Sequence, residues 1–553
     1  MGLFSLSIRQ WGRVKLLFSL LCMCVLLVSS CTSNQVSNPS ASASGNGRIT
    51  IGTTAKPRTL DPADAYELSS LSLVYNMSDR LYTYAPGSTE LKPELATALP
   101  TVSDDGLTYT IPIREGVLFH DGTKFDAKAM EFSLRRFIEN NGKPSFLLSD
   151  SVESVNATGE YELTIKLKQP FAAFPALLAF SGVPALSPQA YEIGEGKFEP
   201  NKFVGTGPYK LAKFGTDSLI FDVFEKYWGE KPANNGITVQ ILSSGVNLYN
   251  NFRKQGVDVA YVALDPDQIR SLEEMSKDDK WLAIPNEGSV VSYLTLNRNQ
   301  KPLDKVEVRQ AIAAMIDREL IFDRVLYGQA ESVYSMIPTT FDVYEPVFKE
   351  KYGKGGNAEK AKELLTKAGF SKDNPAIVEV WYPSGSAPRS LTALVLKALA
   401  KKTMDGMLEF DIHTVESTSA FKNIGKGLYP GFLLSWYPDF LDADNYIQPF
   451  LSCEKGSVEK GCQEGGSQTQ GSFFYSQRMN ELISQERKEQ DPDKRKVIFD
   501  EIQEILSEEV PYVPLWQSKD YVFAQNGITG VELDATQNLI YRNLKKEERG
   551  LDG

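Results

Sequence analysis

One apolar run near the N-terminus constrains what this chain can fold into. The run LLFSLLCMCVLLVSS (residues 16–30) follows a segment that carries Arg9, Arg13 and Lys15 and no acid. It is shorter than the ~20 residues that span a bilayer as a helix, and a basic flank before a short apolar stretch is typical of a secretory signal. No later segment of the sequence is long and apolar enough to cross a membrane. We therefore expect residues 1–30 to be a signal peptide and the remainder to fold outside the cytoplasm.

The leader ends in a pattern that predicts lipid attachment. Val28-Ser29-Ser30-Cys31 places small residues before a cysteine, which resembles a bacterial lipobox. In a lipobox the cysteine is acylated and becomes the new N-terminus, so Cys31 is the predicted lipidation site. The alternative is an uncleaved anchor in which Cys31 stands by chance. Residues 31–46 are predicted to be a flexible linker, because TSNQVSNPSASASGN has no charge and few apolar side chains.

The charge and the size of the exported part limit its class. Loss of the basic leader changes the formal net charge from −12 to −15. Such an acidic surface does not suit nucleic acid, whose binding depends on basic contacts to phosphate. The hydrophobic content of 42% is that of an ordinary globular protein. More than 500 residues exceed one compact core, so we expect two or three lobes.

Two cysteines follow Cys31. They are Cys453 and Cys462, in the polar stretch CEKGSVEKGC. In an exported protein such a pair is best explained as a disulfide. The bond closes a short loop and should contribute about 2–3 kcal/mol at most, so it holds the loop and not the fold. A zinc site is disfavoured because no histidine or further cysteine lies nearby to complete four ligands, and no other metal site is predicted.

The sequence lacks the common motifs of catalysis. The chain has two histidines, His120 and His413, and no G-x-S-x-G or H-E-x-x-H motif. His120 lies in GVLFHDGTKF, where Asp121-Gly122 favours a hairpin turn and a structural role. GKGGNA (353–358) imitates a dinucleotide loop, but no buried strand precedes it and Asn357 suits the N-cap of the next helix. We therefore expect a protein with no catalytic residue and no cofactor.

Strand and helix patterns are mixed along the chain. LTYTIPIREGVLF (107–119) alternates as a strand does, after a turn at Asp104-Asp105-Gly106. ITIGTT (49–54) and PYVPLW (511–516) predict strands near the two ends of the chain. The pattern therefore predicts an α/β or α+β fold.

Two helices are well marked in the sequence. In DKVEVRQAIAAMIDREL (304–320), Asp304 suits the cap and Glu307 the capping-box position. Its apolar stripe, predicted to be core, consists of Val308, Ala311, Ile312, Met315 and Ile316. Near the C-terminus, Asp491-Pro492 starts the helix DKRKVIFDEIQEILSEE (493–509). The apolar face of this second helix is predicted to consist of Val497, Ile498, Ile502 and Ile505.

A series of motifs in a fixed order resembles one protein family. The stretches are RTLDPADA (58–65), LKPELATALPTVSDDGLTYTIPIREGVLFHDGTKFDAKAMEFSLRR (91–136), VGTGPYKL (204–211), FEKYWG (224–229), LTLNRNQKPLDKVEVRQAIAAMIDRE (294–319), SWYPDFLDADNYIQPF (435–450) and RMNELISQERKEQDPDKRKVIFDEIQEILSEEVPYVPLW (478–516). With the lipoprotein leader, they are similar to the solute-binding proteins of ABC transporters, family 5, which is the oligopeptide, dipeptide and nickel type. The similarity is greatest to the peptide-binding members. One departure is Pro100-Thr101-Val102-Ser103, where the family usually shows a tryptophan.

The resemblance implies a fold and a division into domains. The fold would be α/β with two lobes hinged by crossing strands, the periplasmic-binding-protein (Venus-flytrap) fold of the large type, with an additional third domain. Lobe I would consist of residues 47–82, 203–290 and 510–553, the last with the tail. The additional domain II would span residues 83–202, and lobe III residues 291–509.

The resemblance also implies a function. The protein would be a lipid-anchored receptor on the extracytoplasmic side of a membrane, in the periplasm or at the cell surface. It would capture oligopeptides or dipeptides by lobe closure and deliver them to the permease and ATPase complex of an ABC importer. It would act as a monomer, carry no cofactor and perform no chemistry.

Asp439 is the central residue of the predicted site. It lies among aromatic residues after the apolar stretch YPGFLL, where an unpaired carboxylate costs several kcal/mol or shifts its pKa. The resemblance implies that Asp439 binds the free α-ammonium of a peptide. Between closed lobes that exclude water, the ligand would compensate the charge, so binding would be coupled to closure. The other predicted ligand-binding residues are Ser435, Trp436, Tyr437, Tyr66 and Glu67.

The sequence alone leaves alternatives open for Asp439 and for the ligand. Asp439 could be a solvated acid or a local cap, although Asp442 or Asp444 already suits the cap of the following helix. The three aspartates could also ligate calcium, but their spacing matches no EF-hand loop. For the ligand, an oligosaccharide stacked on the aromatic residues is the main alternative, followed by an opine, haem or nickel. An exported enzyme would show turnover, and a surface adhesin would bind without lobe closure.

Overall fold

The computed structural model describes residues 47–85, 87–261, 264–278 and 280–547. The predicted signal peptide (1–30), the predicted lipidation site Cys31 and the predicted linker (31–46) lie outside the described residues. Within the described part of the chain, no helix is long and apolar enough to cross a bilayer.

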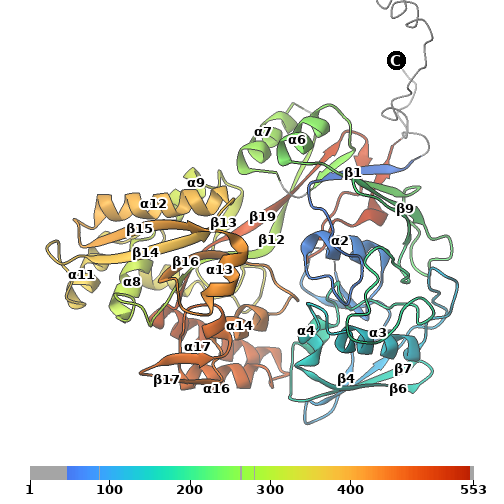
Figure 1. Ribbon diagram of the computed structural model, residues 1–553, viewed down its shortest axis with the longest axis horizontal. Helices are drawn as coiled ribbons and strands as arrows, with labels where there is room; N and C mark the ends of the chain where they lie inside the picture. The colour runs from blue at the N-terminus through green and yellow to red at the C-terminus, as the bar shows by residue number, and fades with distance from the viewer. Residues whose placement is uncertain (1–46, 86, 262–263, 279, 548–553) are drawn as a thin grey trace, which may run out of the picture. The chain divides into compact units, whose positions relative to one another are not determined.

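Eleven strands of the described chain form one mixed sheet (Figure 1). In spatial order they are β15 (Leu408–Val415), β14 (Ala376–Pro383), β16 (Gly431–Trp436), β12 (Trp281–Leu296), β19 (Tyr512–Gln525), β11 (Val259–Tyr261), β1 (Ile49–Thr53), β10 (Ile237–Ile241), β9 (Ser218–Val223) and β8 (Tyr209–Phe214), with β13 (Ala330–Ser332) paired to β19. The strands predicted near the two ends of the chain therefore lie in the same sheet, with only β11 between them.

The long strands β12 and β19 join the two halves of this sheet and run side by side in Figure 1. Trp281–Glu287 pairs with residues 519–525, and Val291–Thr295 pairs with residues 512–517. Between these two runs the register shifts, as it does in a β-bulge, which bends a strand. From Ser289 onward β12 is buried on both faces, and in the sheet it lies between β16 and β19.

A second sheet lies in the segment predicted to be domain II. Its order is β4 (Thr101–Val102), β5 (Thr108–Pro112), β7 (Glu162–Leu167) and β6 (Val152–Gly159). The predicted turn before β5 is present, with Gly106 at a φ of 69°. His120 lies in the predicted hairpin, where Phe119 N donates to Thr123 O. Its ring bonds Gly207 O and burial lowers its pKa to about 4, so its role is structural.

Short two-stranded ribbons complete the β-structure of the described residues. They are β2 (Tyr82–Tyr84) with β3 (Leu91–Pro93), β17 (Lys455–Ser457) with β18 (Gly461–Glu464), and β20 (Ile528–Thr529) with β21 (Lys545–Lys546).

Helices cover the sheets. In the first half of the chain they are α2 (Leu68–Met77), α3 (Ala127–Glu139), α4 (Phe146–Ser149), α5 (Phe174–Leu177), α6 (Gly245–Arg253) and α7 (Pro266–Ser276). In the second half they are α8 (Val306–Met315), α9 (Arg318–Arg324), α10 (Val347–Tyr352), α11 (Ala358–Lys367), α12 (Ala387–Thr403), α13 (Ser417–Ile424), η1 (Ala443–Tyr446), α14 (Gln448–Leu451), α15 (Gly466–Thr469), α16 (Gln477–Glu486), α17 (Pro492–Glu509) and η2 (Tyr541–Asn543).

Local capping explains where several helices begin. Asn357 accepts a hydrogen bond from Lys360 N and caps α11, so the glycine-rich stretch before it is a helix start, as predicted. Asp491 accepts hydrogen bonds from Asp493 N and Lys494 N and caps α17, also as predicted. The predicted apolar face of α17 is wrong at Val497, which is 67% exposed. The buried face is instead formed by residues spaced three and four apart, Phe499, Ile502 and Leu506.

The helix predicted over residues 304–320 is divided in the structure. α8 begins after Lys305, which replaces Asp304 as the N-cap, and α8 ends at Met315. Ile316 has extended dihedral angles, and the Asp317 carboxylate accepts a hydrogen bond from Leu320 N, which caps α9. A capping residue inside the periodic pattern therefore starts a second helix. The predicted stripe is nevertheless buried in the core.

The buried hydrophobic residues of the described chain fall into separate clusters. The largest draws its members from Val291 to Trp516 and includes the first half of β19. A second combines residues 81–185 with Phe440 and Leu441. A third combines residues from 49 to 77, which include the N-terminal strand β1, with residues from 186 to 261 and from 522 to 544. The exact limits of the predicted lobes stay predictions, but β19 contributes to more than one core.

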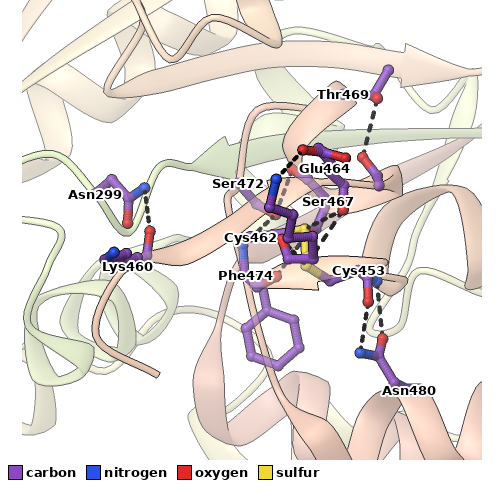
Figure 2. Close-up of a disulfide and its surroundings, with 12 residues drawn as sticks. Asn299, Cys453, Lys460, Cys462, Glu464, Ser467, Thr469, Ser472, Phe474 and Asn480 are labelled. Carbon is purple, nitrogen blue, oxygen red and sulfur yellow. Dashed lines mark hydrogen bonds and ion pairs between the residues drawn. A yellow bond between two sulfur atoms is a disulfide. The ribbon is translucent and has the colours of Figure 1, made fainter. Parts of the chain in front are cut away.

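Cys453 and Cys462 form a disulfide that closes the β17–β18 ribbon (Figure 2). The Asn480 side chain accepts a hydrogen bond from Cys453 N and donates one to Cys453 O, at 2.9 and 2.8 Å. Asn299 donates to Lys460 O at 3.1 Å from the opposite side. The loop is thus attached to the protein by the disulfide and by two asparagine side chains.

Candidate ligand-binding site

A cavity of about 660 Å³ lies next to the C-terminal end of β16. Five of the six predicted ligand-binding residues line it, and these are Tyr66, Ser435, Trp436, Tyr437 and Asp439. Glu67 is not one of the lining residues of the described chain. Its carboxylate accepts hydrogen bonds from Ser70 Oγ at 2.7 Å and from Tyr66 N at 3.2 Å, close to the start of α2.

The register of β16 determines which of its groups reach the cavity. β12 pairs with β16 along its whole length, so that Ser292 lies opposite Ser435 and their hydroxyls are 2.7 Å apart. On the other side, β14 pairs with β16 only at Gly431 and Phe432. Among the described residues, no strand is paired with the β14-facing edge from Leu433 to Trp436. This edge lies where β16 lines the cavity and can accept an added strand.

Asn445 fixes the loop that carries Asp439. Its Oδ1 accepts hydrogen bonds from Trp436 Nε1 at 3.3 Å and from Asp439 N at 2.9 Å. Asp442 caps η1 by accepting a hydrogen bond from Asp444 N at 2.8 Å. The local cap role is therefore filled by Asp442, and the side chain of Asp439 is left to face the cavity.

The calcium arrangement considered for the three aspartates does not form. Arg495 donates to both carboxylate oxygens of Asp442 at 2.7 Å. In the described part of the chain, no group of three or more His, Cys, Asp or Glu side chains is arranged to hold a metal ion.

Asp439 is an acid without a cationic partner among the described residues. Its Oδ1 accepts a hydrogen bond of 2.7 Å from Tyr66 Oη. Burial raises the pKa of Asp439 to about 6, although the hydrogen bonds to Tyr66 and Asn445 oppose the rise. The same burial, together with the adjacent carboxylate, raises the pKa of Tyr66, so Tyr66 stays a neutral donor. The site can therefore bind a ligand cation and be neutralised by it.

Arg389 is a second unpaired charge, and sequence reasoning missed it. It lies in the first turn of α12, and its Nη2 donates to Ser435 Oγ at 3.0 Å. Its Nε is buried without a hydrogen-bond partner in the described structure, and burial lowers its pKa. A cation in the first turn opposes the helix dipole, and this turn contains no acid. That mismatch is the one sequence signal that could have indicated a role in binding.

The segment after Asp439 enters another core. Phe440 and Leu441 pack with residues 81–185, and the rings of Phe440 and Phe171 meet edge to face at 5.9 Å. Leu441 N donates to Tyr84 Oη at 3.2 Å. The position of Asp439 is thus determined by β16 on one side and by the predicted domain II on the other.

Comparison with known proteins identifies the family. The family model of bacterial extracellular solute-binding proteins, family 5 Middle, matches residues 90–457. Di/tripeptide-binding protein 2 of Pseudomonas aeruginosa is 26% identical over 501 residues, which cover 84% of this chain and 89% of the relative. Heme-binding protein A of Haemophilus influenzae is 25% identical, and the match covers 92% of this chain and 97% of that relative.

A solved structure has the same fold. It is the ABC transporter-associated periplasmic binding protein DppA from Helicobacter pylori in complex with the peptide STSA. The two chains are 23% identical, the TM-score is 0.71, and the match covers 91% of this chain and 98% of the other. The α/β fold is therefore the two-lobed periplasmic-binding-protein fold of the large type, with an additional domain. Because its family model matches more than half of the sequence, this chain belongs to the bacterial extracellular solute-binding proteins of family 5.

Proposed function

We propose that this protein is the lipid-anchored receptor of an ABC importer and that it binds short peptides by their two charged ends. Asp439 binds the α-ammonium and Arg389 binds the C-terminal carboxylate. The observation that carries the proposal is Asp439, a half-buried carboxylate that faces a cavity and has no cationic partner among the described residues.

The charges of the cavity suit a zwitterion. A lone acid in a partly buried site is costly, and an ammonium at hydrogen-bond distance compensates it. Arg389 is likewise without an acidic partner among the described residues, and it reaches the cavity wall at Ser435. An acid and a base that are both left unpaired favour a ligand with both charges over a neutral sugar.

The peptide backbone is bound as an added strand. The unpaired edge of β16 from Leu433 to Trp436 offers backbone donors and acceptors next to Asp439. Main-chain hydrogen bonds are independent of the ligand's side chains, so they give affinity for peptides of different sequence. The exposed ring of Tyr437 and the ring of Trp436 supply an apolar wall.

Binding is coupled to closure of the lobes. Tyr66 precedes α2 in the predicted lobe I, whereas Asp439 follows β16 in the predicted lobe III. Their hydrogen bond therefore joins the two lobes and must break when the lobes separate. A ligand ammonium at Asp439 stabilises only the state in which the two lobes meet, which shifts the equilibrium toward closure.

The relatives and the leader support the location and the partner. Peptide binders occur among the relatives, and the family is described as extracellular. Cys31 and the linker 31–46 attach the receptor to the membrane surface. The closed receptor then delivers its peptide to the permease and ATPase complex, without chemistry of its own.

Native mass spectrometry of the freshly purified protein tests the proposal. We expect bound masses that fragment into peptides with a free N-terminus, released when the protein is denatured. A protein that carries only oligosaccharide, opine, haem or nickel would keep its family assignment but would refute peptide binding.

A further inference from the structure

A second carboxylate near the cavity has no partner. Asp520 lies on β19 opposite Asn286 of β12, close to the register shift that separates the two halves of the strand pair. In the described structure its Oδ2 is buried and accepts no hydrogen bond. Burial alone raises the pKa of Asp520 to about 7, because no neighbouring cation compensates the charge.

Asp520 lies beside Gly288 and Gln537, and Gln537 lines the cavity. A Cβ atom placed on Gly288 would lie 2.8 Å from Asp520 Oδ2 and 2.9 Å from Gln537 Nε2, so both groups lie against the same side of the backbone. Gln537 and Ser289, which follows Gly288, line the cavity. Gln537 Nε2 is also buried without a hydrogen-bond partner in the described structure. An unpaired acid and an unpaired amide therefore lie together at the edge of the ligand site.

Lys519 and Arg389 each have a partner other than Asp520. Lys519, the preceding residue, pairs with Glu331 at 3.3 Å. Arg389 donates to Ser435. Burial raises the pKa of Tyr437. Arg389 opposes this rise and Asp520 adds to it, so both charges act on the same phenol. Tyr437 is 58% exposed and lines the cavity, which means that Asp520 is within electrostatic reach of a ligand beside that ring.

We propose that Asp520 is a subsite for a second cation of the ligand, so that the preferred substrates are peptides with a basic side chain in addition to the α-ammonium. The inference rests on the proposed peptide binding and deepens it. Asp439 recognises what all such peptides share, and Asp520 selects among them. The side-chain oxygen of Gln537 would accept a hydrogen bond from the same cation, because its nitrogen can only donate.

Matched peptides test this selection by isothermal titration calorimetry on the protein produced from the full sequence. Lysine and norleucine have the same four-carbon stem and differ in the terminal ammonium. They are compared at the first, second and third positions of otherwise identical alanine peptides. We expect at least a tenfold preference for lysine at one position in the natural protein. Asp520→Asn should remove that preference and change the affinity for the norleucine peptide less than about twofold.

The outcomes are distinguishable. The exposed Asp222, which pairs with Arg48, supplies the matched control Asp222→Asn, which should leave the preference intact. The second-cation subsite would be refuted if peptides bind without any preference for lysine, or if the preference survives Asp520→Asn. Neither result would contradict peptide binding itself. If neither peptide binds, the proposed function itself fails. The comparison in the natural protein needs no variant, so it decides the matter even if Asp520→Asn does not fold.

Discussion

The hydroxyl of Tyr66 donates a 2.7 Å hydrogen bond to the carboxylate of Asp439, across 373 residues of sequence. The bond joins the segment before α2 to the loop after β16 and holds the acid at the cavity. Because Tyr66 is a neutral donor, it stabilises the carboxylate without neutralising it. Among the described residues, the carboxylate is left without a cationic partner.

Replacement of Asp439 separates binding from stability. Asp439→Asn should lower the affinity for a peptide with a free N-terminus at least tenfold, because the ammonium loses its counter-charge. The melting temperature without ligand should stay level or rise. The folded pKa lies above that of the unfolded chain, so the ionised acid destabilises the empty protein above about pH 6. Calorimetric titration and thermal melts measure both effects, with Asp222→Asn as the control. Unchanged affinity would remove Asp439 from the site.

The same pKa predicts how affinity depends on pH. Protonation of Asp439 below about pH 6 removes the charge that binds the ammonium. At pH 5 only about one-tenth of the carboxylates are ionised, so affinity for alanyl-alanine should be about tenfold weaker than at pH 7. This peptide lacks a second cation, so it isolates Asp439 from Asp520. The Asp439→Asn variant should show a flat profile over this range, and a flat profile in the natural protein would contradict the prediction.

Tyr66→Phe tests the hydrogen bond itself. The bond favours the ionised carboxylate, so its loss should move the midpoint of the pH profile upward. Affinity near pH 6.5 should fall about threefold to tenfold, the usual effect of roughly 1 kcal/mol. The aromatic contact with Phe146 is kept, since that contact involves the ring. Tyr249→Phe, whose hydroxyl contacts Ser271 on α7, is the matched control. A lower affinity with an unmoved midpoint would indicate a packing effect instead.

Arg389 is tested with peptides that lack the carboxylate. The natural protein should bind a peptide with a free C-terminal carboxylate more tightly than the same peptide with a C-terminal amide. The carboxylate supplies the counter-charge that Arg389 lacks. Arg389→Gln should reduce this ratio of affinities to near one, with most of the loss on the free acid. Lys397→Gln on the exposed side of α12 should leave the ratio unchanged. An undiminished ratio in Arg389→Gln would assign carboxylate binding to another residue.

The disulfide should affect stability locally. Because Cys453 and Cys462 are nine residues apart, loss of the bond in a double serine variant should lower the free energy of unfolding by about 2–3 kcal/mol at most. Urea denaturation measures the change, and circular dichroism checks that the fold is retained. Loss of the folded state would mean that the ribbon β17–β18 supports the core more than its short loop suggests.

Parts of the fold could be predicted where the signal is local. Asn357 and Asp491 cap helices because a side-chain oxygen next to free backbone N–H groups needs no distant partner. The same rule failed at residues 304–320, because one periodic stretch contains two possible capping residues, Asp304 and Asp317, and the structure uses Asp317 to start a second helix. The prediction failed at Val497 because apolar residues lie on more than one side of α17, and packing decides which side is buried.

The residues of the candidate site also differ in how far the sequence could predict them. Asp439 could be found because an acid among aromatic residues is unusual in any environment. Arg389 offered only a weak signal, a cation in the first turn of a helix, and Asp520 offered none, because a charge becomes unusual mainly when folding buries it without a partner. Nothing near Asp520 in sequence indicates that Gly288 and Gln537 will lie beside it.

The sequence by itself determined the acidic character, the paired cysteines and several helix starts, and it predicted the leader and the aspartate of the candidate site. The tertiary structure alone decided which remote side chains meet that aspartate and which charges remain unpaired. The physical reason is that capping and periodicity act over a few residues, whereas desolvation depends on every chain segment that packs around a group.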